Sequence, residues 1–287
     1  MKIRIGTRTS RLALVQTEMV SNRIKEKFPE VDIVTVPIST KGDRIQNKPV
    51  SEIGGSAVFT DDIEQALINK EIDLAIHSAK DLPSYLGDGL EIVSVLERAD
   101  YRDAIITKNG TQIQNIPDFV IGTGSKRRIL NTKKYYPKAT FKVIRGNVDV
   151  RLEKLLKGDY DAIILAMAGI TRLGFDKDER FEFKKFTYNE FITEPCQAII
   201  ALESRKDDFV TPVVKAIRDE KTFYAFEIER YVFEKLNHDG SVPLGAYAFT
   251  NDDEITLSLS INGKNILTDT DKIENRFKLA DKLVNIV

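Results

Sequence analysis

Short apolar runs alternate with helix-like stretches along most of the chain, and this alternation constrains the fold more than any other feature. The first predicted strands, with helices between them, are residues 2–6, 31–40, 73–77 and 91–97. Ser10 is placed to cap one helix and Thr60 another, with Asp61 and Asp62 in the dipole-favoured first turn. Such a βαβα order predicts a largely parallel sheet with helices on both faces.

The same rhythm returns in a second unit, roughly residues 100–190. The predicted strands of this unit, each followed by a helix, are 119–122, 141–144 and 161–166. The charged stretch 97–103 is interpreted as the crossover into it. From about Glu194 the chain is predicted to be helical, first at 197–205 and then at 213–220.

The last part of the chain has a different pattern. A long amphipathic helix is predicted at 222–236, and a closing helix at 271–287. Stretches that alternate apolar and polar residues are 245–250, 254–261 and 265–270. Asn262-Gly263, between two of these stretches, is a strong hairpin signal. The predicted fold class is α/β, and the predicted domains are an α/β domain (1–98 with 194–217), a second α/β domain (99–193) and a small C-terminal α+β domain (218–287).

Composition excludes several classes of protein. The 287 residues carry 43 basic and 44 acidic side chains, so no overall charge attracts the chain to nucleic acid or to a membrane surface. The single cysteine, Cys196, excludes an internal disulfide framework and fits a reducing compartment. The longest apolar run, 162–170, is too short to span a bilayer, and the first residues are not a secretory signal. We therefore expect a cytoplasmic protein.

Four arginines stand where predicted strands give way to helices: Arg127, Arg128, Arg145 and Arg151. Backbone N–H groups at a helix start are unpaired and favour anions, and guanidinium groups add bidentate donors for carboxylate or phosphate. The alternative is a solvated basic helix face. Because the same arrangement occurs twice, one βα unit apart, the pattern favours a site for a polyanion.

The stretch 77–83 follows a predicted buried strand, at the sheet edge where ligands of α/β proteins bind. Lys80 and Asp81 supply a cation and a carboxylate there, although a capping Asp beside a surface Lys explains them equally well. Arg8 precedes the first helix in the same way. His77 is interpreted as a packed residue, and neither a phosphate-binding loop nor a zinc-ligand spacing occurs.

Together, several segments resemble the porphobilinogen deaminase (hydroxymethylbilane synthase) family. In chain order, these segments are 6–14, 40–43, 77–83, 98–104, 122–128, 145–151 and 162–174. The resemblance implies two periplasmic-binding-like α/β domains and a third, smaller domain. It also implies a transferase of haem and porphyrin biosynthesis that removes ammonia from porphobilinogen and joins four pyrroles into hydroxymethylbilane. The implied partners are pyrrole or tetrapyrrole carboxylates, and we expect a monomer that binds no nucleic acid.

The resemblance also assigns roles to individual residues. Asp81 is similar to the catalytic carboxylate, which stabilises a cationic pyrrole intermediate and the pyrrole N–H. The implied binders of acetate and propionate side chains are Arg8, Lys80, Arg127, Arg128, Arg145, Arg151 and Arg172. The implied supporting residues are Ser10, Phe59, Ser78, Thr123, Ser125 and Gln197. From sequence alone, Phe59 is more often a core residue, whereas the resemblance places it against a pyrrole.

One motif departs from the family pattern. The family attaches a dipyrromethane primer to a cysteine in a Gly-Gly-Cys-x-x-Pro-x-Gly loop, and residues 238–245 put Gly240 at the place of that cysteine. Gly240 offers no nucleophile, so covalent attachment of dipyrromethane there is doubtful. Cys196 is a substitute anchor by hypothesis, and the alternative is an inert small hydrophobic residue.

Three functions remain open from the sequence. The first is a hydroxymethylbilane synthase that holds its primer through Cys196 or without a covalent bond. The second is a divergent paralogue that binds or modifies a polycarboxylate tetrapyrrole, and the third is a non-catalytic anion-binding module. A carboxylate among bound carboxylates costs binding energy through like-charge repulsion, so Asp81 beside the arginines favours an enzyme.

Overall fold

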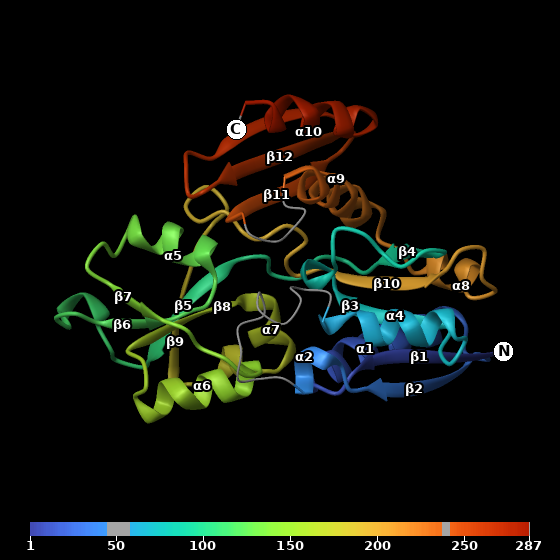
Figure 1. Cartoon of the computed structure of the whole chain (residues 1–287), viewed down its shortest axis with the longest axis horizontal. Coiled ribbons are helices and arrows are strands. Elements are labelled where there is room, and N and C mark those ends of the chain that lie inside the picture. Colours follow the sequence, from blue (N-terminus) through green and yellow to red (C-terminus); the bar gives the residue numbers. More distant parts are fainter. Residues whose placement is uncertain (45–57, 237–241, 287) are drawn as a thin grey trace.

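Three sheets organise the chain in the computed structural model, which describes residues 1–44, 58–236 and 242–286 (Figure 1). The first sheet has the order β2 (Asp32–Ile38), β1 (Lys2–Arg8), β3 (Leu74–Ser78), β10 (Ile200–Arg205) and β4 (Leu90–Val95). The second sheet has the order β7 (Thr140–Lys142), β6 (Val120–Gly122), β8 (Ala162–Ala166), β5 (Asp103–Lys108) and β9 (Phe181–Lys185). Two five-stranded sheets with helices confirm the predicted α/β class.

Each of these sheets is largely parallel and contains one reversed strand. In the first sheet β1 is parallel to β2 and β3, while β10 is antiparallel to both of its neighbours. In the second sheet β6 is parallel to β7 and β8, while β5 is antiparallel to both of its neighbours. The reversed strand is in each case the one that the chain enters from the other sheet.

Helices follow the strands as the sequence predicts. Those of the first sheet are α1 (Arg11–Lys27), α2 (Lys41–Arg44), α4 (Asp61–Ile68) and α8 (Thr211–Ala216), with a 3-10 turn η2 (Ala79–Asp81). Those of the second sheet are α5 (Lys126–Lys133), α6 (Val148–Lys157) and α7 (Met167–Arg172), with 3-10 turns η3 (Ile113–Asn115) and η4 (Phe175–Lys177). Ser10 caps α1, since its side chain accepts from the Ala13 N–H. In the described parts of the chain, no helix is long and apolar enough to cross a membrane.

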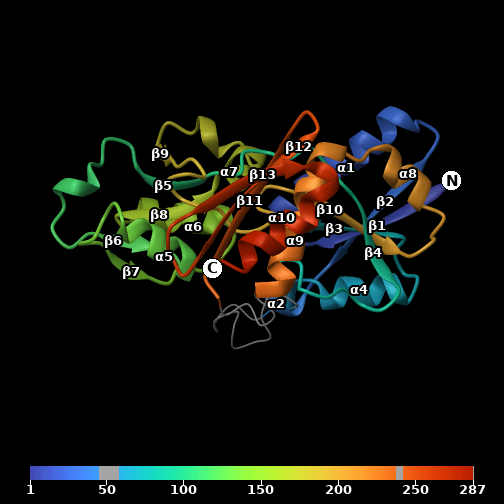
Figure 2. The ribbon, with the colours of Figure 1, turned by 90° about the horizontal axis from the view of Figure 1, so that it is seen from above.

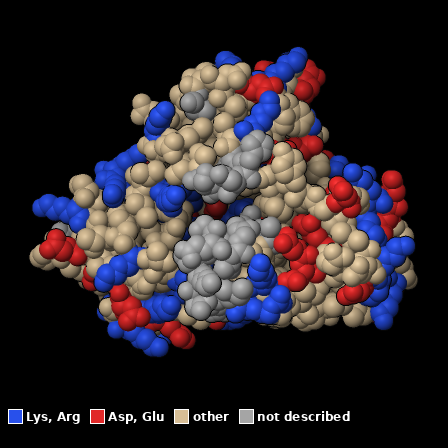
Figure 3. Space-filling view, viewed as in Figure 1, with Lys and Arg blue, Asp and Glu red and all other residues tan. Residues whose placement is uncertain are grey.

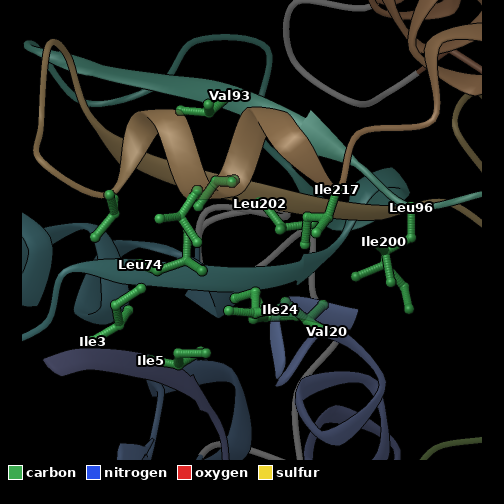
Figure 4. Close-up of a cluster of buried hydrophobic side chains, with 14 of the residues drawn as sticks. Ile3, Ile5, Val20, Ile24, Leu74, Val93, Leu96, Ile200, Leu202 and Ile217 are labelled. Carbon is green, nitrogen blue, oxygen red and sulfur yellow. The ribbon is translucent and has the colours of Figure 1, made fainter. Parts of the chain in front are cut away.

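The core of the first sheet follows from the alternation of side chains along its strands. Leu74 and Ile76 lie in one cluster with Val20 and Ile24 of α1 (Figure 4). Ala75, between them in the sequence, belongs to a second cluster with residues of α4. Because successive side chains of a strand point to opposite faces, one strand contributes to both layers of helices.

The C-terminal part forms a third, antiparallel sheet. Its elements are β11 (Leu244–Asn251), β12 (Glu254–Ile261), β13 (Leu267–Lys272), η5 (Ile273–Asn275) and the helices α9 (Glu220–Leu236) and α10 (Arg276–Val284). Asn262 and Gly263 both have positive φ, at 54° and 70°, and Lys264 N–H donates to Ile261 O across the turn. The predicted hairpin is therefore confirmed, and the mirror-image turn explains the Asn-Gly pair.

Two connections link the α/β sheets. A crossing segment (residues 96–102) runs from β4 to β5, and a return segment (residues 186–199) runs from β9 to β10. The third sheet lies across the junction of the other two in both ribbon views (Figures 1 and 2). The face in Figure 3 is hollowed at this junction, and charged side chains are visible in the hollow.

One predicted helical stretch is wrong, and another begins later than predicted. Residues 200–205, within a predicted helix, form the strand β10 between β3 and β4. Ile200, Ala201 and Leu202 are fully buried, so the stretch has no amphipathic pattern and periodicity could not tell a helix from a strand. The closing helix α10 also begins later than predicted, because residues 271 and 272 complete β13.

Candidate active site

The hollow between the two α/β sheets contains a cavity of about 330 Å³. Both sheets contribute to it through residues at the ends of their strands and through the first turns of their helices. The predicted site residues in its lining are Arg8, Ser10, Phe59, Ser78, Lys80, Asp81, Arg128, Arg145, Arg151, Arg172 and Gln197. The fold therefore brings together the predicted catalytic carboxylate and most of the predicted carboxylate binders.

Asp81 lies in η2, the single turn that follows β3. Lys80 precedes it, and its Nζ is 3.5 Å from Glu194 Oε2 on the return segment. Ser78, at the end of β3, bonds to the side chain of Gln16 on α1, with 3.0 Å between Ser78 Oγ and Gln16 Nε2. The turn with Asp81 is thus connected to the first helix and to the return segment.

Arg8 ends β1 and is held at the edge of the cleft. Its guanidinium forms an ion pair with Asp43 and lies 4.3 Å from the centroid of the Phe59 ring. Burial alone would raise the pKa of Asp43, but hydrogen bonds from Arg8 and Thr40 lower it. A Cβ on Gly42 would lie 2.2 Å from the Phe59 ring, so glycine is required for this packing. Phe59 is half-buried and lines the cleft, and its contact with a pyrrole stays a prediction.

Arg151 and Arg172 carry positive charges that have no ion-pair partner among the described residues. Burial and the nearby charges of Arg128 and Arg145 lower the pKa of Arg151 to about 10, although Asp81 acts in the opposite direction. Burial lowers the pKa of Arg172 to about 10. Within the described residues neither guanidinium forms an ion pair, although Arg151 donates to Gly146 O and Arg172 to Ala198 O, each at 2.7 Å. An anion in the cleft would relieve this excess of charge.

The neighbours Arg127 and Arg128 occupy different environments. Arg128 lines the cleft, but Arg127 is buried behind it and is not part of the lining. Both pair with the buried carboxylate of Asp103, at 2.8 Å from Arg127 Nη1 and 2.7 Å from Arg128 Nη2. Burial would raise the pKa of Asp103, but the two arginines outweigh it and hold this pKa at about 2. Arg127 therefore lies outside the lining of the cleft, and its role as a carboxylate binder stays a prediction.

Thr123 and Ser125 also lie outside the lining of the cleft. Thr123 Oγ1 accepts from the Ser125 N–H at 3.2 Å, and Ser125 Oγ accepts from the Arg128 N–H at 3.4 Å. Ser125 is the N-cap of α5. In this structure the two hydroxyls shape the turn that places Arg128, rather than facing the cavity themselves.

Cys196 is separated from the cleft, although the next residue, Gln197, lines it. The thiol is buried in a core cluster, with Sγ 3.9 Å from Phe226 O of α9. Burial, with a smaller contribution from Glu229, raises the pKa of the thiol, which disfavours the reactive thiolate. The structure therefore gives no support to Cys196 as a covalent anchor. Gly240 lies outside the described residues.

Two buried or half-buried carboxylates were missed as site residues, Asp43 and Asp103. Both belong to segments that resemble the family, 40–43 and 98–104. The sequence therefore pointed to these two segments, but it did not predict that either aspartate pairs with a site arginine. Pairing between residues this distant in the chain depends on strand order, and that order could not be derived from local patterns. His77, by contrast, is packed as predicted: it is buried, with Nε2 2.9 Å from Glu203 Oε2.

Comparison with known proteins identifies the family. A family model described as porphobilinogen deaminase, dipyromethane cofactor binding domain, matches residues 3–211. Porphobilinogen deaminase of Rickettsia prowazekii is 44% identical over 250 residues, which cover 86% of this chain and 82% of that protein. Porphobilinogen deaminase of Oceanobacillus iheyensis is 39% identical over 279 residues, which cover 94% of this chain and 88% of that protein.

Solved structures give a more distant likeness. The VFT2 domain of Bordetella pertussis BvgS has a TM-score of 0.45 at 11% identity, covering 75% of this chain and 86% of that one. An arginine-specific periplasmic binding protein of Salmonella typhimurium has a TM-score of 0.40 at 10% identity, covering 83% of this chain and 96% of that one. The sequence relatives and the matching family model are decisive: the chain belongs to the porphobilinogen deaminase family.

Proposed function

We propose that this chain is a transferase that removes ammonia from porphobilinogen and joins the resulting pyrroles into hydroxymethylbilane. The observation that carries the proposal is a cleft in which the η2 turn, with Asp81, lies together with several arginines, and two of these, Arg151 and Arg172, have no ion-pair partner among the described residues. Porphobilinogen carries an acetate and a propionate, so it brings the anions that this cleft lacks. A pure anion-binding module would gain nothing from a carboxylate at that place.

The roles of the residues follow from their chemistry. When ammonia leaves porphobilinogen, the C–N bonding pair departs with the nitrogen and a positive charge develops on the pyrrole. The carboxylate of Asp81 stabilises that charge and accepts a hydrogen bond from the pyrrole N–H. Arg151, Arg172 and Arg145 bind the acetate and propionate groups, which fixes the ring relative to Asp81. Phe59, held beside Arg8, offers its ring face to a pyrrole.

The cleft also fits a dipyrromethane group. Dipyrromethane with acetate and propionate substituents is a polycarboxylate, and the described donor set is rich in guanidinium groups, two of them without an ion-pair partner among the described residues. Arg128, Arg145, Arg151 and Arg172 would hold its carboxylates. When bound, dipyrromethane supplies the pyrrole carbon to which the first substrate is joined.

The attachment of this primer belongs to the same proposal. Cys196 is buried outside the cleft and Gly240 has no nucleophile, so we propose that ion pairs hold dipyrromethane without a thioether. Mass spectrometry distinguishes the two forms of attachment. We expect a bound group in the spectrum of the native protein and an unmodified mass of the denatured chain. A denatured chain that retains the added mass would contradict non-covalent binding.

Turnover is tested by incubating the protein with porphobilinogen and measuring uroporphyrin after acid treatment and oxidation. We expect activity in the unaltered protein and loss of at least two orders of magnitude in Asp81→Asn, because the amide cannot stabilise a developing cation. Asp178→Asn is the matched control, since Asp178 lies outside the lining of the cleft and forms an ion pair with the exposed Arg180. Full activity of Asp81→Asn would contradict the catalytic role, and no product from the unaltered protein would contradict the proposed function.

A further inference from the structure

The buried carboxylate of Asp103 lies directly behind the cleft and has no part in the function proposed so far. It begins β5, the strand that the chain enters after the crossing segment, and it is fully buried. Its side chain contacts donors from two other parts of the chain. Arg127 and Arg128 come from the first turn of α5, and Gln197 comes from the return segment.

We infer that Asp103 is a positioning residue, which fixes Arg128 for a substrate carboxylate and connects it to the return segment through Gln197. The inference deepens the proposed function, because it rests on Arg128 as a binder of pyrrole carboxylates.

The hydrogen bonds of Arg128 support this role. Its Nε and Nη2 donate to Asp103 Oδ1 at 3.1 and 2.7 Å, and its Nη1 donates to Ile164 O at 3.1 Å. A guanidinium has five N–H donors, so two remain for a ligand. Each of its three nitrogens is held by the protein, and the side chain loses little further freedom when a carboxylate binds. Preorganised donors of this kind bind a charge without the cost of reorientation.

Asp103 is buried deeply enough to remain a fixed counterion of Arg128 when a ligand binds. It is absent from the lining of the cleft, so a ligand carboxylate does not meet it directly and does not displace it. The ion pair of Lys80 differs, because the side chain of its partner Glu194 is 43% exposed. The charge of Asp103 therefore stays with Arg128 whether or not a ligand is bound.

The link to the return segment depends on Gln197. Its Nε2 donates to Asp103 Oδ1 at 3.2 Å and to Tyr101 O of the crossing segment at 2.7 Å. Arg127 adds a second link, with Nη1 2.7 Å from Ile192 O. Through Gln197, Asp103 thus links the start of α5 to both the crossing segment and the return segment. These bonds fix the position of Arg128 relative to the two segments.

The first sheet provides a matched control. Asp73 is also a buried carboxylate between two arginines, with Arg4 Nη2 at 2.6 Å and Arg205 Nη2 at 3.6 Å. It lies just before β3, at the opposite end of that strand from Ser78 and η2, and it does not line the cleft. Replacing either aspartate by asparagine removes a buried negative charge that pairs with two arginines, although Arg4 is more exposed than Arg127 or Arg128.

The test compares Asp103→Asn with Asp73→Asn in thermal unfolding and in steady-state turnover of porphobilinogen. We expect both variants to lose several degrees of Tm. Only Asp103→Asn should raise KM, by about tenfold, with a much smaller change in kcat, because binding of ground and transition states is weakened alike. Equal effects of the two variants on KM, or an unchanged KM in Asp103→Asn, would overturn the inference.

Asp103→Glu covers the case in which the asparagine variant does not fold. It retains the charge but moves the carboxylate by one methylene. The extra methylene in a fully buried site should lower Tm, but by less than the loss of the charge does. Positioning predicts a raised KM, whereas a role in charge balance alone predicts an unchanged KM and would contradict the inference. The Tm shift caused by porphobilinogen reports binding without turnover, so failure of the proposed reaction and failure of this inference can be told apart.

Discussion

The arginines of the cleft differ in whether a carboxylate of the protein neutralises their charge. Arg8 is balanced by Asp43, and Arg128 by Asp103. Arg151, in contrast, has a pKa lowered to about 10 by burial and by its positive neighbours. A cation whose pKa is lower in the folded state binds fewer protons there than in the unfolded chain. Its charge therefore opposes folding at neutral pH, and this cost is relieved as pH rises above about 10.

We predict that Arg151→Gln raises the Tm of the ligand-free protein and abolishes most of the Tm increase caused by porphobilinogen. The substitution removes a charge that costs folding energy but attracts the ligand. For the unaltered protein, binding should weaken as pH rises through about 10, because the neutral side chain no longer attracts a carboxylate. Differential scanning fluorimetry measures both effects. Arg180→Gln, at an exposed pair with Asp178, is the control and should change neither.

Among the elements, the return segment has the most unusual backbone. Cys196 and Ala198 both have positive φ, at 60° and 73°, and they flank Gln197. Side chains with a Cβ rarely adopt this region, which costs roughly 1–2 kcal/mol per residue. The conformation places the Gln197 side chain on Asp103 and the Ala198 carbonyl on Arg172. The strained backbone is therefore part of how this segment contributes to the cleft.

We predict that Ala198→Gly stabilises the protein by about 0.5–1 kcal/mol. Glycine adopts the left-handed region without strain, and this gain exceeds the extra entropy of the unfolded chain. Urea unfolding followed by circular dichroism measures the change. Ala201→Gly, in the middle of β10, is the control and should destabilise by a similar amount, because it weakens a buried strand. Destabilisation by Ala198→Gly would show that the positive φ is not costly here.

For the whole molecule, one buried carboxylate joins the third sheet to both connections. Glu229 of α9 accepts from Arg98 Nη1 and Nη2 of the crossing segment, each at 2.7 Å. It also accepts from the Cys196 N–H of the return segment at 2.5 Å and from the Ala248 N–H of β11 at 2.6 Å. Tyr101 packs on Tyr247 at the same junction, with ring centroids 4.0 Å apart. The C-terminal part is thus fixed to the place where the two α/β sheets are connected.

We predict that Glu229→Gln destabilises the protein by about 3–5 kcal/mol, since it leaves Arg98 as an uncompensated buried charge. Loss of this junction should also split one unfolding transition into two, because the C-terminal part has its own core. Calorimetry and urea unfolding detect the change. Glu234→Gln, at a 40% exposed position of the same helix, should stay within about 0.5 kcal/mol of the unaltered protein.

The division into domains remains a prediction. The membership of β10 in the first sheet supports the assignment of 194–217 to the same domain as 1–98. The third sheet with α9 and α10 supports a separate unit at 218–287. The chain would then pass between the two α/β domains twice, and both passages contribute residues to the cleft.

The sequence by itself determined most of the alternation of strands and helices, the cap of α1, the C-terminal hairpin turn, and the strand ends where the cleft forms. These properties depend on neighbours within a few residues, such as Ser10 with Ala13, or Asn262 with Gly263. The Thr60 side chain, predicted to cap α4, makes no capping hydrogen bond there. The tertiary structure alone decided that β10 is a strand, because its apolar residues are buried between two other strands. It also decided which of two adjacent arginines lines the cleft. Arg127 and Arg128 are adjacent on α5 and both pair with Asp103, but Arg127 also donates to Ile192 O of the return segment and only Arg128 lines the cleft. Which of them reaches the cleft depends on how α5 packs against segments that are distant in the sequence.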